Sequence, residues 1–132
     1  MKKTILLIED DTTLQELLSQ LLSRKGYSVI GCRDGIRACE YVAKFEPDMI
    51  VSDLNLPGYS GLEITRIVRA NSAFSHIPVL LMSAHPGRTP GIDATKAGAD
   101  GYIAKPFNIN ELSDKISDIF SRNAFQPDLA AS

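Results

Sequence analysis

The sequence has few cysteines, no long hydrophobic run and no excess of charge of either sign. Its 132 residues carry a formal net charge of −2, and its 14 lysines and arginines are scattered rather than clustered. A basic surface that attracts nucleic acid is therefore not indicated, and we expect no direct binding to DNA or RNA. The two cysteines, Cys32 and Cys39, are too few for a disulfide framework and form no CxxC motif. We expect both to be packing residues in a reducing cytosol.

No stretch has the length expected of a signal peptide or a membrane span. The N-terminal MKKTILLIEDD has two lysines, but its apolar run is short and three acids follow. We therefore expect a cytoplasmic protein without membrane insertion. The composition, 44% hydrophobic and 23% charged, is typical of one globular domain with a buried core.

Short apolar runs alternate with amphipathic stretches along the chain. The runs at 4–8, 49–52 and 78–83 are nearly continuous, and the run at 101–104 is a weaker fourth; such runs predict strands buried on both faces. The mixed run at 27–32 predicts a strand nearer an edge. Between the strands, apolar residues recur at helical spacing. One helix is expected to start after Asp11 and to stop at Gly26, and a second is expected to end before Pro47. A third is expected to start at about Gly61. The last is expected to start at Asn108, with Glu111 in a capping-box arrangement.

The fourth helix in chain order is the least regular. Thr89 is its expected cap, Pro90 its first residue and Gly98 its stop, which leaves about two turns. The Pro- and Gly-rich run at 86–91 is expected to shorten or loosen it. From residue 123 the periodicity is lost, so we predict a domain over 1–122 and a tail or the start of a linker over 123–132.

Five strand–helix units predict an α/β protein with a parallel sheet, right-handed crossovers and helices on both faces. In such sheets ligands gather at the carboxyl ends of the strands. Glu9 and Asp10 follow the first strand, Asp53 the third, Ser83 the fourth and Lys105 the fifth. We therefore expect these side chains to lie together at one edge of the sheet.

The chemistry of these side chains favours phosphoryl transfer. Neighbouring carboxylates repel one another, and a divalent cation with oxygen ligands, such as Mg²⁺, removes that repulsion. Lys105 and Ser83 add a positive charge and a hydroxyl group beside Asp53. Because phosphoryl transfer depends on positioning and charge neutralisation, Asp53 is the predicted nucleophile and would form an aspartyl phosphate.

Each of these residues also has an ordinary structural explanation. The acids at 9–11 fit a solvated turn in which Asp11 caps a helix, Ser83 fits a strand-end hydroxyl, and Lys105 fits a surface residue. Suitable residue types at four separate strand ends favour a shared site over these separate explanations.

The stretches ILLIEDD, MIVSDLNLPGYSGLEI, PVLLMSA and GADGYIAKPF resemble the receiver domains of two-component signalling, the response-regulator family. The resemblance extends over residues 4 to about 121 and implies a flavodoxin-like (βα)5 fold with strand order 2-1-3-4-5. It also implies a phosphoprotein that acts as a switch, with Mg²⁺ as its cofactor. Such a protein is not an enzyme for other substrates, because it only phosphorylates and dephosphorylates its own aspartate.

The resemblance implies a set of metal ligands. Asp53 accepts the phosphoryl group and also binds Mg²⁺. Asp10 and the backbone carbonyl of Asn55 are the other direct ligands, and Glu9 acts through water.

The resemblance also implies how the phosphoryl group is sensed. Ser83 and Lys105 contact it, and the Lys105–Pro106 peptide is expected to be cis. As Ser83 moves toward the phosphoryl oxygens, Tyr102, at the aromatic switch position, turns inward. The face made by the fourth helix, the fifth strand and the last helix then changes its affinity for a partner.

The implied phosphodonor is a histidine kinase or a histidine phosphotransfer protein, and the sequence does not identify the downstream protein. A monomer or weak dimer is expected. A single-domain regulator and the receiver part of a longer regulator or hybrid kinase both fit. A degenerate receiver that binds its partner without phosphorylation is a further alternative.

Two other classes share part of the pattern. Phosphatases with an aspartate nucleophile carry a DxD motif whose second aspartate is the acid–base, and here Asn55 stands at that position. A flavodoxin-like FMN carrier needs hydroxyl and amide donors after the first strand, where the acids at 9–11 would repel the phosphate. The sequence therefore disfavours both.

Overall fold

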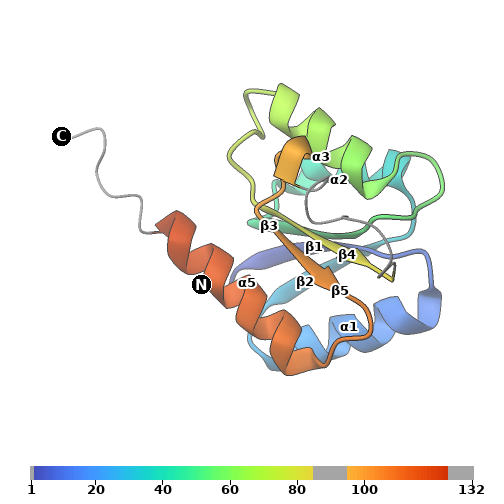
Figure 1. Ribbon diagram of the computed structural model, residues 1–132, viewed down its shortest axis with the longest axis vertical. Coiled ribbons are helices and arrows are strands. Elements are labelled where there is room, and N and C mark those ends of the chain that lie inside the picture. The colour runs from blue at the N-terminus through green and yellow to red at the C-terminus, as the bar shows by residue number, and fades with distance from the viewer. Residues whose placement is uncertain (1, 85–94, 125–132) are drawn as a thin grey trace.

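The computed structural model describes residues 2–84 and 95–124 and has a five-stranded sheet between two layers of helices (Figure 1). The strands are β1 (Thr4–Ile8), β2 (Ser28–Cys32), β3 (Met49–Asp53), β4 (Val79–Ser83) and β5 (Gly101–Ala104). Neighbouring strands are parallel, in the order β2-β1-β3-β4-β5. The α/β class, the flavodoxin-like topology and the expected strand order are confirmed. The prediction that the strand at 101–104 is buried on both faces is wrong, because β5 lies at the edge of the sheet and only Ile103 of its four residues is buried.

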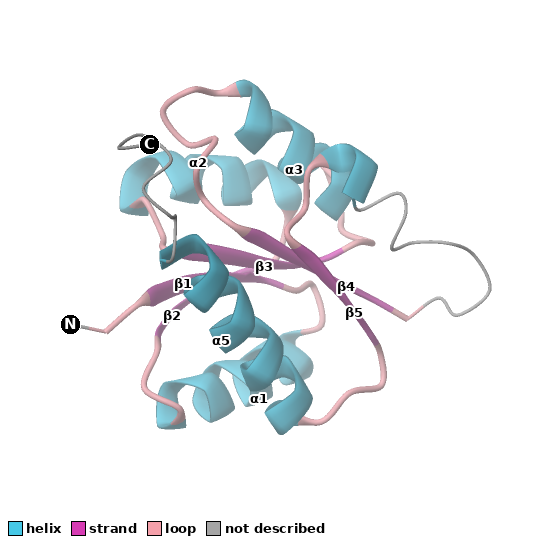
Figure 2. Ribbon diagram, turned by 60° about the vertical axis from the view of Figure 1, so that its left-hand side comes forward, coloured by secondary structure: helices cyan, strands magenta, loops and turns pink. Residues whose placement is uncertain are grey.

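The helices of the described residues lie on both faces of the sheet. They are α1 (Thr12–Arg24), α2 (Gly35–Phe45), α3 (Gly61–Ala70) and α5 (Ile109–Ala124). α1 and α5 cover one face, and α2 and α3 cover the other (Figure 2). None of these helices has the length and apolar character needed to cross a membrane.

Two predicted boundaries fall partly outside the described residues. Residues 95–97 are helical at the place of the predicted fourth helix, and Gly98 follows with a φ of 98°. The expected start at Thr89 and the run at 86–91 are not described. α5 continues to Ala124, two residues into the predicted tail, and residues 125–132 are not described.

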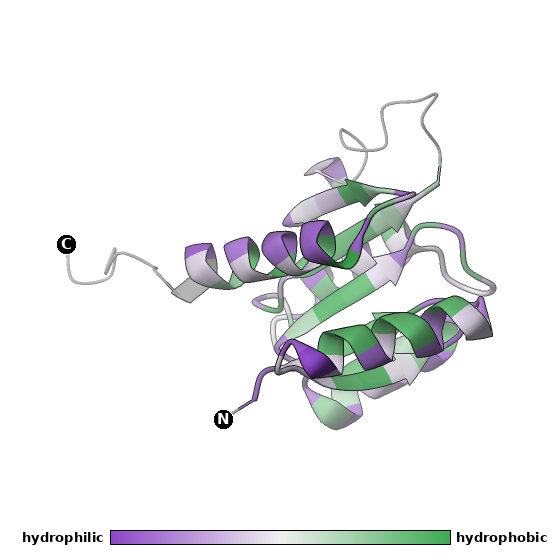
Figure 3. Cartoon of the chain, turned by 90° about the horizontal axis from the view of Figure 1, so that it is seen from below, coloured by the Kyte–Doolittle hydropathy of each residue, from purple (hydrophilic) through white to green (hydrophobic). Residues whose placement is uncertain are grey.

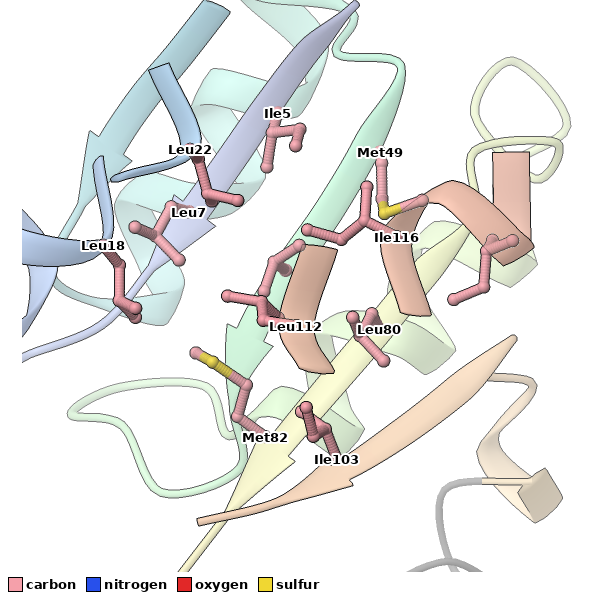
Figure 4. Packing of buried hydrophobic residues seen from close by; sticks show 12 residues of the cluster. Ile5, Leu7, Leu18, Leu22, Met49, Leu80, Met82, Ile103, Leu112 and Ile116 are labelled. Atoms are coloured by element: carbon pink, nitrogen blue, oxygen red, sulfur yellow. The ribbon is translucent and has the colours of Figure 1, made fainter. Parts of the chain in front are cut away.

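The strands of the sheet are mainly hydrophobic (Figure 3). Because successive side chains of a strand point to opposite faces, the sheet separates two hydrophobic cores. Ile5 and Leu7 of β1 pack with α1 and α5 (Figure 4), whereas Leu6 and Ile8 pack with α2 and α3. All four are fully buried, and each contributes roughly 1.5–3 kcal/mol to folding. The central strands are thus held firmly from both sides, which fixes the positions of their carboxyl ends.

Polar residues set where the helices begin. Asp11 caps α1 by accepting a backbone N–H of the first turn at 3.1 Å, and Asn108 accepts the N–H of Glu111 at 2.9 Å. Both caps confirm the predicted starts. α3 begins with a full capping box between Ser60 and Glu63, a cap that was not among the predicted ones.

Candidate functional site

Parallel pairing brings the predicted site residues to one edge of the sheet. Asp53 is the last residue of β3, Ser83 is the last residue of β4, and Glu9 and Asp10 directly follow β1. The backbone N–H of Lys105 donates to the carbonyl oxygen of Ser83 at 2.7 Å, so Lys105 lies beside the end of β4. The five residues therefore share the carboxyl edge, as the alternating pattern predicts.

The ammonium group of Lys105 lies between two buried carboxylates. Its Nζ is 2.8 Å from Oε1 of Glu9 and 3.0 Å from Oδ2 of Asp53. Glu9 is 1% exposed and Asp53 is 8% exposed. Ionised carboxylates at such depth are costly without a cation or hydrogen-bond donors. Lys105 supplies a positive charge and a hydrogen-bond donor to both carboxylates.

Burial and pairing have opposite effects on the ionisation of this cluster. Burial raises the pKa of the Glu9 carboxyl, although hydrogen bonds from Lys105 and from the backbone N–H of Asp11 act in the other direction. For Lys105, burial lowers the pKa, but the hydrogen bonds to Glu9 and Asp53 outweigh burial and the pKa is raised. Lys105 is therefore fully charged at neutral pH.

Three carboxylates converge on one point. Glu9, Asp10 and Asp53 each offer a ligand oxygen, and these oxygens lie within 4.8 Å of one another. The backbone N–H of Asn55 donates to Oδ1 of Asp53 at 3.3 Å, which places the Asn55 backbone next to the cluster. Hard oxygen ligands and an excess of negative charge over the single ammonium of Lys105 fit Mg²⁺.

The loop after β3 packs closely against Asp53 because residue 61 has no side chain. The Gly61 N–H donates to the carbonyl oxygen of Leu54 at 3.0 Å. A Cβ at Gly61 would lie 2.5 Å from the carbonyl oxygen of Asp53. α3 thus starts directly against the Asp53 backbone, and a larger residue would displace it.

The residues expected to sense a phosphoryl group lie on β4 and β5. Ser83 is buried, and Tyr102 is half-buried against the α2–α3 core. Tyr102 is paired in register with Leu81, two residues before Ser83 on the neighbouring strand. The Lys105–Pro106 peptide is cis, as the resemblance implies.

A groove next to Lys105 was not anticipated from the sequence. It has a volume of about 300 Å³ and is lined by leucines of α1, by the segment from Lys105 to Phe107 and by Ile109. Leu17, one of these leucines, is 51% exposed. The leucines of α1 follow the ordinary spacing of an amphipathic helix, so no signal in the sequence distinguished the exposed Leu17 from the buried leucines.

Comparisons with known proteins agree with this architecture. The family model of the response regulator receiver domain matches residues 5–117. Chemotaxis protein CheY of Pseudomonas aeruginosa is 35% identical over 119 residues, which cover 89% of this chain and 96% of that protein. The DNA-binding response regulator MtrA of Mycobacterium tuberculosis is 32% identical over 127 residues, which cover 96% of this chain but 54% of MtrA.

Solved structures give the same result. A response regulator from Chloroflexus aurantiacus superposes with a TM-score of 0.87 at 31% identity, over 92% of this chain and 99% of that one. The chemotaxis response regulator CheY4 of Vibrio cholerae superposes with a TM-score of 0.84 at 27% identity, over 90% and 99% of the two chains. Likeness in sequence and likeness in fold thus each extend over about nine tenths of the chain.

Proposed function

This chain belongs to the response-regulator receiver domain family, and on that basis we propose that it is a phosphoryl-accepting switch whose acceptor is Asp53. The observation that carries the proposal is the bridge from Lys105 to Glu9 and Asp53, with Asp10 completing the acid cluster. One carboxylate oxygen of Asp53 is held by Lys105 and the other accepts the N–H of Asn55. The nucleophile is therefore oriented before any donor arrives.

Each site residue has a role in the proposed reaction. A carboxylate oxygen of Asp53 attacks phosphorus, the P–N bond to the donor imidazole breaks, and its electron pair leaves with the imidazole nitrogen. Lys105 pairs with the phosphoryl oxygens and Ser83 hydrogen-bonds to them. Asp10, Asp53 and the Asn55 carbonyl would hold Mg²⁺, with Glu9 acting through water; the ion supplies charge neutralisation when bound. Water later cleaves the acyl phosphate, so the chain turns over only its own aspartate.

Ser83 and Tyr102 link the site to the proposed output face. A phospho side chain adds roughly −1.5 to −2 units of charge and several acceptor oxygens. We expect the hydroxyl of Ser83 to move toward those oxygens and Tyr102 to move inward behind it. The surface of residues 95–97, β5 and α5 then presents a different shape, and a partner that prefers this shape reads the signal.

We place the phosphodonor protein on the groove between α1 and the segment after β5. Asp53 is 8% exposed, so the donor has to cover the edge of the sheet where Lys105 lies. The groove shares Lys105 with the site and is otherwise mainly apolar. A helix of a histidine kinase or histidine phosphotransfer protein with an apolar stripe fits such a groove. We expect this exchange to take place in the cytoplasm.

The test is the mass of the intact chain after incubation with a small acyl phosphate or phosphoramidate, with and without Mg²⁺. We expect one base-labile phosphoryl adduct that requires Mg²⁺ and is absent from Asp53→Asn. Asp11→Asn is the matched control, because asparagine caps a helix as well as aspartate does. An adduct that persists in Asp53→Asn would contradict the assignment. No adduct in the wild type with either donor would favour a receiver that binds its partner without phosphorylation.

A further inference from the structure

The side chain of Gln15 ties α1 to the ends of β1 and β2. Its Nε2 donates to the carbonyl oxygen of Glu9 at 3.1 Å and to that of Cys32 at 2.7 Å. These two bonds account for both amide hydrogens. The Cys32 carbonyl also accepts the backbone N–H of Glu9 at 2.9 Å. Gln15 thus completes a network on the two strand ends that lead into the acid cluster.

The carbonyl oxygen that Gln15 holds belongs to the peptide between Glu9 and Asp10. Because a peptide is planar, fixing its oxygen fixes the direction in which Asp10 leaves the strand. Asp10 is exposed, and its carboxylate is repelled by those of Glu9 and Asp53, so turning out into solvent would relieve the repulsion. The bond from Gln15 opposes that rotation at the backbone.

We propose that Gln15 is a positioning residue that holds Asp10 ready to bind Mg²⁺, an inference that rests on the proposed function. Gln15 itself does not belong to the acid cluster and acts through the Glu9–Asp10 peptide. Without its amide donors, the peptide is free to rotate and the ion has to order Asp10 as it binds. The expected loss in Mg²⁺ affinity is about 10-fold, the low end for removing a group that orients a metal ligand.

Gly31 of β2 provides the space for the Gln15 amide. A Cβ at residue 31 would lie 2.6 Å from Oε1 of Gln15 and 2.9 Å from its Cδ. A glycine inside a strand weakens it and often marks a close approach. Its φ is not among the positive values of this chain, so the backbone does not require glycine here. Gln15, Gly31 and Asp10 line one cavity of about 710 Å³, which gives a displaced amide room to move.

The experiment is a calorimetric titration of Mg²⁺ into the full chain without a phosphodonor. Gln15→Met keeps the length of the side chain but removes the donors, and Gly31→Ala keeps Gln15 but displaces its amide. We expect each variant to lose about 10-fold in affinity. The double variant should bind Mg²⁺ no more weakly than the single variant with the lower Mg²⁺ affinity, because both changes break the same contact. Gln20→Met, at an exposed position of α1, should bind Mg²⁺ like the wild type.

Stability without metal separates positioning from a merely structural role. In urea unfolding with EDTA, Gly31→Ala should be as stable as the wild type or more stable, while its Mg²⁺ affinity falls. Unchanged Mg²⁺ affinity in both Gln15→Met and Gly31→Ala would overturn the inference while leaving the proposed function intact. A wild type that binds no Mg²⁺ and forms no adduct would instead overturn the proposed function, and this inference with it.

Discussion

Lys105 serves two buried carboxylates at once, so its removal leaves both without their cation. We expect Lys105→Met to lower the free energy of unfolding by about 1–3 kcal/mol, the usual cost of stranding buried polar groups. Mg²⁺ should restore more stability to this variant than it adds to the wild type, because the ion replaces the missing positive charge. Urea unfolding with EDTA and with Mg²⁺ measures both effects.

Lys115→Met, at an exposed position of α5, is the matched control and should behave like the wild type in both conditions. Equal stability of Lys105→Met and Lys115→Met in EDTA would contradict the bridging role that the two short contacts of Lys105 indicate.

The two cysteines should be slow to react in the folded chain. Burial raises the pKa of both thiols, Cys32 and Cys39, above their ordinary value, so the reactive thiolate is scarce near pH 8. The pKa of each thiol is higher in the folded chain than in the unfolded chain. The two thiols therefore contribute their full share to stability at a pH below the ordinary thiol pKa, and this share is lost as the pH rises through the pKa of the folded chain. Iodoacetamide should label half-buried Cys39 before buried Cys32, and both more slowly than in urea. Immediate labelling of Cys32 in the folded chain would refute this.

Residues differ in how far the sequence predicts their placement. The proximity of Glu9, Asp53 and Lys105 was predictable from the sequence. Parallel strands end at one edge of the sheet, and phosphoryl transfer requires these residue types. The position of Gln15 could not be predicted, since its partners are backbone carbonyls, which leave no side-chain pattern. The glycine at position 31 was the available hint.

At the scale of single elements, α2 ends under strain. Glu46 follows the helix with a φ of 44°, in the left-handed region where a Cβ is unfavourable. We expect Glu46→Gly to raise the free energy of unfolding by about 0.5–1 kcal/mol, because glycine takes this conformation freely and is the usual residue there. Urea unfolding measures the change.

Glu40→Gly is the matched control for that substitution. Residue 40 is an exposed glutamate in the interior of the same helix, where glycine is expected to cost up to about 1 kcal/mol. Opposite signs for the two substitutions would show that the backbone conformation, and not the loss of a glutamate, sets the effect. A loss of stability in both would contradict the strain at Glu46.

Element starts were predictable where a capping residue precedes an apolar stripe, as at Asp11 and Asn108. Side-chain contacts between different elements were not predictable from the sequence. Arg69 of α3 reaches the carbonyl oxygens of Ile77 and Gly98 and the carboxylate of Asp100 at 2.7, 2.8 and 2.6 Å, and so anchors the segment that leads into β5. An arginine on a helix gives no sign in the sequence of which distant carbonyls it will bind.

At the scale of the whole molecule, the alternating pattern predicts a parallel sheet but not the order of its strands. Several orders would bury the same apolar runs, because a strand that is apolar on both faces fits any interior position. The order 2-1-3-4-5 followed from the family resemblance. The edge position of β2 is the exception, since its mixed run at 27–32 already indicated an edge strand. The edge position of β5 was not predicted, because its run at 101–104 is apolar although only Ile103 is buried.

The groove beside Lys105 yields a prediction about the encounter of two whole molecules. Leu17→Glu places a charge at the groove on a side chain that is 51% exposed, so the core is left intact. We expect phosphoryl transfer from a phosphorylated histidine kinase or histidine phosphotransfer protein to slow about tenfold or more, as for the loss of a central apolar contact. Labelling by a small acyl phosphate should stay unchanged, because it needs only Asp53 and its neighbours.

Ile67→Glu is the matched control on α3, where residue 67 is 40% exposed. Because α3 covers the opposite face of the sheet, it should leave both reactions unchanged. Equal slowing of protein-borne transfer by Leu17→Glu and Ile67→Glu would place the donor elsewhere.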